Sequence, residues 1–150
     1  METCTGVKGN YGTQVPMGKL TVAAEDEPLS VYRELELETG LASDKLELKG
    51  GKVLRESFLS SPDKVMAVRV TAEGKAPDFC LWLEGWSQPS RTQWEERNKA
   101  LHVHGRALEN IHSDGLTGVS YDICLRYDTD GHVSWNRRGL VITGASHLTV

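Results

Sequence analysis

The sequence lacks any long apolar segment. None of its apolar runs approaches the roughly 18–20 residues that a membrane-spanning helix needs. The first 20 residues are polar and rich in glycine, without the apolar stretch of a signal peptide. The sequence therefore predicts no membrane partner, and it contains no targeting signal from which a cellular location can be read.

Cysteine is scarce, with three residues far apart in the chain: Cys4, Cys80 and Cys124. They form no CxxC pair, which excludes a structural zinc site of that type. The odd count does not suit a disulfide framework, so we expect buried, reduced thiols. One disulfide with a leftover thiol is the alternative. We expect no cofactor.

Positive charge is also in short supply. Seventeen Lys and Arg stand against 21 Asp and Glu, which gives a net charge of −4. Proteins that bind nucleic acids concentrate basic residues on one surface, whereas the basic clusters here, such as Arg137-Arg138, are short. We therefore expect no nucleic-acid partner.

Apolar and polar residues alternate along most of the chain, which is typical of strands with one buried face. In the clearest run, 31–37, the predicted buried side carries Val31, Leu35 and Leu37. Further strands are predicted at 41–48, 52–59, 63–71, 79–83, 100–108, 121–127, 132–135, 140–143 and 147–150. No segment has a convincing helical pattern. The 150 residues therefore predict one all-β domain, an antiparallel β-sandwich.

Turn residues separate these strands at 38–40, 50–51 and 61–63, and at 128–131, where a hairpin turn is predicted. Residues 85–99 are predicted to form a long polar loop, and 109–118 a second irregular stretch. The last residues, 145–150, stop inside a predicted strand, so we expect the chain to be a fragment of a larger domain.

Two segments, YRELELETG at 32–40 and RESFLSSPDKV at 55–65, resemble segments of a known family, the N-terminal domain of glycoside hydrolase family 95, the α-L-fucosidase family. The first resembles its YRRELDLETG segment, and the second resembles its REVFASHPDQV segment. Shorter similarities follow in the same order at 15–22, 67–70, 105–107 and 141–145. Together they extend over roughly residues 14–150.

The resemblance implies a supersandwich-like β domain that supports a separate catalytic (α/α)₆ barrel, its expected partner. The first strands of the family domain and the barrel have no counterpart in residues 1–150, so no catalytic residue is carried over. We therefore expect a single partial β-sandwich domain with a non-catalytic role. The alternative function is an independent carbohydrate-binding module with a glycan as partner. Exposed strand edges would also allow a homodimer.

No carboxylate pair suits catalysis. Inverting glycosidases hold two acid–base groups about 6.5–9.5 Å apart across the scissile bond. The densest carboxylates are Glu95-Glu96 and the pair Glu34 and Glu36. We interpret them as solvated side chains and assign no catalytic residue.

Two histidines, His102 and His104, share one face of a predicted strand, about 6.6 Å apart by strand rise. With His112 or His132 they could chelate a metal. Such a site needs three or four ligands, however, and the spacing fixes only two. Residues 128–131 resemble the start of a calcium loop but lack its later ligands. No metal site is therefore predicted.

The four tryptophans give the strongest indication of carbohydrate binding, because aromatic rings can stack on the C–H faces of sugars. Trp82 lies within a predicted strand and is expected to pack. Trp86 and Trp94 flank the predicted 85–99 loop, and together with Trp135 they form the candidate glycan-binding set. Core packing, or docking against the barrel, is the other role for these rings and the one that we favour, because large aromatic residues supply core and interface area.

Overall fold

The computed structural model describes residues 16–85, 90–108 and 118–150. These residues form β-strands and connecting turns, with one 3₁₀ turn, η1 (Glu96–Asn98). No described helix has the length and apolarity that crossing a membrane requires. All strand pairs are antiparallel. The prediction of an all-β antiparallel sandwich is confirmed.

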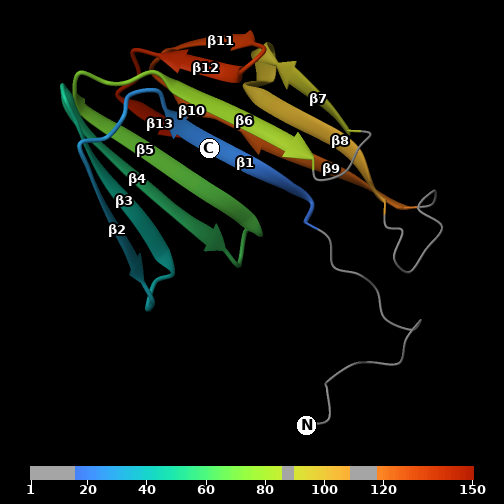
Figure 1. Ribbon diagram of the computed structural model, residues 1–150. Coiled ribbons are helices and arrows are strands. Elements are labelled where there is room, and N and C mark those ends of the chain that lie inside the picture. Colours follow the sequence, from blue (N-terminus) through green and yellow to red (C-terminus); the bar gives the residue numbers. More distant parts are fainter. Residues whose placement is uncertain (1–15, 86–89, 109–117) are drawn as a thin grey trace.

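The strands form three sheets (Figure 1). The four-stranded sheet has the order β1 (Gly18–Ala24), β6 (Phe79–Gly85), β12 (Gly139–Thr143), β11 (His132–Asn136). The six-stranded sheet has the order β10 (Asp128–Thr129), β13 (His147–Thr149), β5 (Val65–Gly74), β4 (Gly51–Ser60), β3 (Leu41–Leu48), β2 (Ser30–Glu36). The three-stranded sheet has the order β7 (Ser90–Glu95), β8 (Ala100–Leu108), β9 (Gly118–Arg126).

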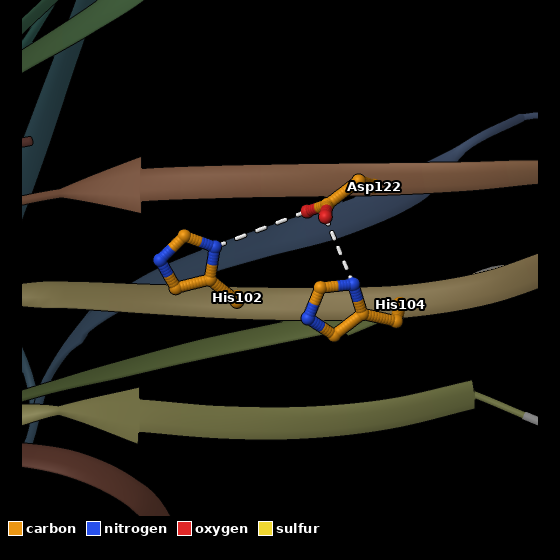
Figure 2. Close-up of side chains that lie close together, drawn as sticks. All are labelled: His102, His104 and Asp122. Atoms are coloured by element: carbon orange, nitrogen blue, oxygen red, sulfur yellow. Dashed lines mark ion pairs between the residues drawn. The ribbon is translucent and has the colours of Figure 1, made fainter.

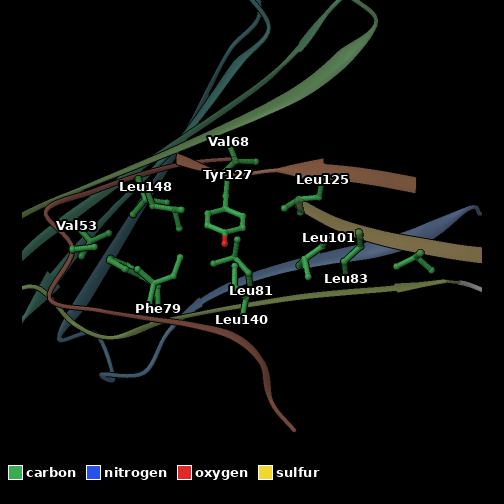
Figure 3. Packing of buried hydrophobic residues seen from close by; sticks show 14 of the residues in the cluster. Val53, Val68, Phe79, Leu81, Leu83, Leu101, Leu125, Tyr127, Leu140 and Leu148 are labelled. Carbon is green, nitrogen blue, oxygen red and sulfur yellow. The ribbon is translucent and has the colours of Figure 1, made fainter. Parts of the chain in front are cut away.

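All three sheets contribute side chains to one core (Figure 3). β6 points Phe79, Leu81 and Leu83 inward at every second position, as a strand with one buried face must. The largest fully buried side chains are Phe79, Leu81, Leu101, Leu140, Ile142, Leu148 and Val103. Burying a side chain of this size contributes about 1.5–3 kcal/mol, so this core is the main source of stability.

The edge strand β2 differs from its prediction. Its alternation predicted a buried side with Val31, Leu35 and Leu37, yet every residue of β2 is exposed. Leu37 follows the strand and is exposed as well. Within the six-stranded sheet the buried residues lie on β3, β4, β5 and β13, and no described residue covers β2. Alternation indicates that a strand has an apolar face, but it does not show that another layer covers that face.

The segment 85–99 corrects a second prediction. Residues 90–95 form β7, which pairs along its whole length with β8. The half-buried side of β7 carries Ser90, Thr92 and Trp94. Two of these three residues are polar, so the sequence has no apolar alternation, and pairing with β8 decides the conformation. Residues 86–89 and 109–117, where the other predicted irregular segments lie, are outside the described residues.

The predicted hairpin turn at 128–131 is wrong. Asp128 and Thr129 form β10, which pairs with β13. The chain passes here from β9 in the three-stranded sheet to β11 in the four-stranded sheet, so the flanking strands do not pair with each other. The other predicted turns are confirmed, and Gly40 adopts a φ of 70° in the β2–β3 turn, where glycine has no steric penalty.

The thiols are less buried than predicted. Cys80 is half-buried and Cys124 is exposed, and both are free. Each occupies an outward position on a strand whose neighbouring residues point into the core, which explains the error. The Cys80 thiol donates to the carbonyl oxygen of Arg138 at 3.0 Å, and burial raises its pKa. Cys4 lies outside the described residues.

Candidate functional site

Three tryptophans from three strands form one cluster, which we call the tryptophan cluster: Trp82 on β6, Trp94 on β7 and Trp135 on β11. Trp135 lies between the other two. Its ring centroid is 6.5 Å from that of Trp82, at an interplanar angle of 12°, and 6.3 Å from that of Trp94, at 20°. These values describe offset stacking, the arrangement that aromatic rings prefer.

Hydrogen bonds hold the outer two rings in place. The indole N–H of Trp94 donates to the Tyr127 hydroxyl at 3.1 Å, and that of Trp82 donates to Glu84 at 3.3 Å. Trp135 is 36% exposed, so part of this ring remains open to solvent between its two oriented neighbours. A partly exposed aromatic ring held in this way can contact the C–H groups of a sugar.

The structure brings together only two of the three residues predicted to bind a glycan. Trp94 and Trp135 come together, whereas Trp86 lies outside the described residues. Trp82, which we expected only to pack, is the third member of the cluster. Its place on β6, alternating with the buried Leu81 and Leu83, puts it on the outward side of the strand. That alternation was the signal in the sequence that could have identified it.

The densest carboxylates do not converge on one site. Glu34 and the neighbouring Glu36 are exposed on β2, at the edge of the six-stranded sheet. Glu95 and Glu96 lie in the other part of the fold, where β7 ends and η1 begins. Glu36 accepts a hydrogen bond from the Thr39 hydroxyl in the adjacent turn at 2.7 Å. The interpretation that no catalytic residue is present stays a prediction.

The acidic residues of the segment that resembles a calcium loop already have partners. Asp130 accepts hydrogen bonds from the Ser146 hydroxyl at 2.5 Å and from the backbone N–H groups of Ser146 and His147 at 3.0 and 3.1 Å. Lys99 donates to Asp128 at 2.8 Å and lowers the pKa of that carboxyl. These bonds give both carboxylates a structural role.

The histidines separate into different parts of the fold. His102 and His104 lie side by side on β8, and His104 contacts Asp122 of β9. His132 lies on β11 in another sheet, and His112 is outside the described residues. Neither of the predicted third ligands is therefore placed beside the pair in the described structure. Asp122 was not among the candidates.

One half of the six-stranded sheet presents an uncovered apolar surface. Cross-strand partners share a face, and the register continues the face of the buried Val53 and Val68 outward to β2. We call the exposed side chains on this face the uncovered inner face: Val31, Leu35, Leu59 and Met66, which are 45%, 58%, 78% and 57% exposed.

A groove runs beside the uncovered inner face, between β1 and strands β3 to β5. Its lining combines apolar side chains with Asp44 and Arg55. Arg55 donates to Asp44 and to the carbonyl oxygen of Val22, and Arg33 pairs with the same carboxylate at 3.2 Å. Among the described strands β1 pairs with β6 alone, so it is an edge strand of that part of the fold. The groove, the free edge and the apolar surface together form a region suited to contact with protein.

Comparison with known proteins places this fold in a family. Residues 1–150 match the family model described as glycosyl hydrolase family 65, N-terminal domain. A search of curated proteins finds no match. The family match supports the expectation of a glycoside hydrolase N-terminal domain, and it names family 65, whereas the sequence resemblance named family 95. Because the match spans the whole chain, this protein belongs to the N-terminal domain family of the family 65 glycosyl hydrolases.

Proposed function

We propose that this chain is a non-catalytic β-sandwich domain of an α-L-fucosidase-like glycoside hydrolase, and that it supports a separate catalytic barrel. Two sequence observations support the proposal. The N-terminal-domain family model accounts for all 150 residues. The segments 32–40 and 55–65 resemble family 95, whose enzymes cleave α-L-fucosides, and this is the basis for the proposed substrate class.

The uncovered inner face carries the structural part of the proposal. Leu35 and Leu59 are more than half exposed on the same face of the sheet whose other half forms the core. Apolar surface of this kind, next to a free strand edge, favours burial against protein. We propose that its occupant is further polypeptide of the parent enzyme, so that residues 1–150 form part of a larger sandwich.

Covering this face would stabilise the enzyme. Each buried CH₂ group contributes about 0.8 kcal/mol, so even partial burial of four apolar side chains is worth several kcal/mol. Arg33, Asp44 and Arg55 lie in a row on the same face. Their side chains could also form hydrogen bonds with the backbone of the polypeptide that covers this face. A domain that binds in this way holds the barrel in place without contributing groups that react with substrate.

Hydrolysis assays test the proposal. The chain alone and the full-length enzyme that carries this domain are incubated with 2′-fucosyllactose and with a nitrophenyl α-L-fucoside, and fucose release is measured. We expect release by the full-length enzyme only. A nitrophenyl α-L-galactoside serves as the control for sugar specificity. Turnover by the chain alone would refute the non-catalytic role, and a full-length enzyme that leaves both fucosides intact would refute the substrate class.

The tryptophan cluster favours a second candidate function, an independent carbohydrate-binding module. Trp135 supplies an exposed ring, and Trp94 supports it from β7. Titration with fucosylated and other oligosaccharides should then quench the tryptophan fluorescence. Trp135→Ala and Trp94→Ala should abolish that response, whereas Tyr32→Ala, which removes an exposed ring at the opposite edge of the fold, should preserve it. No quenching by any sugar would exclude this function.

A further inference from the structure

We propose that His102, His104 and Asp122 bind a divalent transition-metal ion such as Zn²⁺. The sequence supplies two ligands, His102 and His104, because residues two apart on a strand share a face. The tertiary structure adds the third ligand through strand pairing. His104 lies directly across the β8–β9 ladder from Asp122, so their side chains point to the same side.

The three side chains converge on one point of the outer face of the three-stranded sheet (Figure 2). Nδ1 of His104 lies 2.8 Å from Oδ2 of Asp122, and Nδ1 of His102 lies 3.9 Å from Oδ1 of the same carboxylate. One ligand atom from each of the three residues can be chosen so that all lie within 4.8 Å of one another. Ligands around a tetrahedral zinc are about 3.4 Å apart, given metal–ligand bonds of about 2.0–2.1 Å. Small side-chain rotations would close the difference.

The backbone under this cluster is well supported. β8 is the central strand of its sheet, hydrogen-bonded to β7 on one side and β9 on the other. On the opposite face of β8, Leu101 and Val103 are fully buried in the core. The two imidazole rings stack at a centroid distance of 6.0 Å and an angle of 7°. Both rings are therefore carried by a strand that is held on both sides, which reduces the entropic cost of ordering them on binding.

The donor atoms select the class of metal. Imidazole nitrogen suits Zn²⁺, Cu²⁺ and Ni²⁺, whereas Ca²⁺ and Mg²⁺ prefer sites built entirely from oxygen. His102 is 26% exposed, and His104 and Asp122 are 53% and 56% exposed, so water can fill the remaining coordination positions. Nε2 of His102 faces Glu95 at 3.9 Å, and a carboxylate beside the second nitrogen is a common support for a metal-binding histidine.

The structure also contains a group that opposes cation binding. Arg91 lies across the β7–β8 ladder from His104, on the same face as the cluster. Its positive charge lowers the affinity for a second cation nearby. A hydrogen-bonded pair of His104 and Asp122 without a metal is the competing interpretation. In that interpretation His102 stays 3.9 Å from Asp122 and has no direct bond to the pair, whereas a metal ion would bind it, so His102 is the residue that separates the two.

Titration calorimetry with ZnCl₂ tests the proposal on the untagged chain, after treatment with chelator and in a buffer that does not bind metals. We expect one ion per chain. His102→Ala, His104→Ala and Asp122→Ala should each weaken binding about tenfold or more. His132→Ala, which removes an exposed histidine in another sheet, is the matched control and should bind like the wild type. Arg91→Ala should bind more tightly.

A second measurement follows the site spectroscopically. Co²⁺ bound by two imidazoles should give visible d–d absorption. One equivalent of Zn²⁺ should displace the Co²⁺ and abolish this absorption, and the His102→Ala variant should not show it. CaCl₂ and MgCl₂ should produce neither heat nor displacement. The proposal is overturned if Zn²⁺ does not bind, if it binds equally well to the His102→Ala and His104→Ala variants, or if His132→Ala abolishes binding. Circular dichroism of each variant checks that the sheet is intact.

Discussion

Ser146 donates two hydrogen bonds to Asp130, one from its hydroxyl at 2.5 Å and one from its backbone N–H at 3.0 Å. The backbone N–H of His147 donates a third at 3.1 Å. These bonds join the segment before β11 to the start of β13, although Asp130 and Ser146 are 16 residues apart in the sequence. They hold the pKa of the Asp130 carboxyl down at about 2, chiefly through the Ser146 hydroxyl.

We expect Asp130→Asn to lower the free energy of unfolding in a pH-dependent way. A carboxyl with a depressed folded-state pKa stabilises fully above its unfolded pKa of about 3.9. That stabilisation is lost as the pH falls through the folded-state value of about 2. Urea unfolding of wild type and variant should show the largest difference between about pH 5 and 7 and only a small one at about pH 2. Glu38→Gln, in another turn, is the control, and a difference that does not change with pH would contradict the expectation.

Arg55 and Arg33 pair with the same carboxylate but should differ in importance. Arg55 donates through Nε to Asp44 at 2.7 Å and reaches the Val22 carbonyl oxygen of β1 at 3.2 Å, so it links the two large sheets. The Arg33 side chain is 75% exposed and lies 3.2 Å from Asp44. We expect Arg55→Met to cost about 1–2 kcal/mol of unfolding free energy. Arg33→Met should cost less than about 1 kcal/mol. Equal losses in denaturant unfolding would argue against a link between the sheets through Arg55.

Tyr121 occupies a space that two glycines leave open. A Cβ atom at Gly85 or Gly105 would lie 2.1 or 2.3 Å from the Tyr121 hydroxyl oxygen, and this buried hydroxyl has no hydrogen-bond partner among the described residues. We expect Gly105→Ala to destabilise the fold by about 1–3 kcal/mol through overpacking.

Two further variants complete this test. Tyr121→Phe should have little effect, because the hydroxyl it removes makes no hydrogen bond in the described structure. Gly50→Ala should cost less than Gly105→Ala, because the nearest atom to its added Cβ, the Cβ of Lys75, lies at 3.1 Å instead of 2.3 Å. Thermal unfolding ranks the three variants, and a stable Gly105→Ala protein would show that Tyr121 can move aside.

The uncovered inner face should cause the isolated chain to self-associate, as the sequence also predicted from exposed strand edges. Light scattering over a range of concentrations should show association of the wild type. The double variant Leu35→Lys, Leu59→Lys should be monomeric, and it should keep its stability because both side chains are largely exposed. Val119→Lys, at an exposed apolar position on β9, should still associate. A wild type that is a monodisperse monomer at every concentration would refute this prediction.

The sequence by itself determined the class of fold and most of its strands. Alternation of the type seen in Phe79, Leu81 and Leu83 depends on neighbours along one strand, which the sequence contains in full. The β2–β3 turn can be predicted from local sequence as well, because it depends on a positive φ at one residue, Gly40, whose φ is 70°. The whole-chain match to a glycosyl hydrolase N-terminal domain likewise agrees with the broader part of the resemblance that the sequence carried.

Only the tertiary structure decided which faces are covered and which distant residues meet. The pattern of β2 resembles that of a buried strand, but burial requires a second layer, and a strand's own sequence does not encode that layer. β7 has no clear pattern and forms because β8 supplies its hydrogen-bond partners. The sequence also does not show that Trp82, Trp94 and Trp135 form one cluster, or that Asp122 lies beside His104. Each group depends on sheet register and on the packing of sheets, which join residues far apart in the chain.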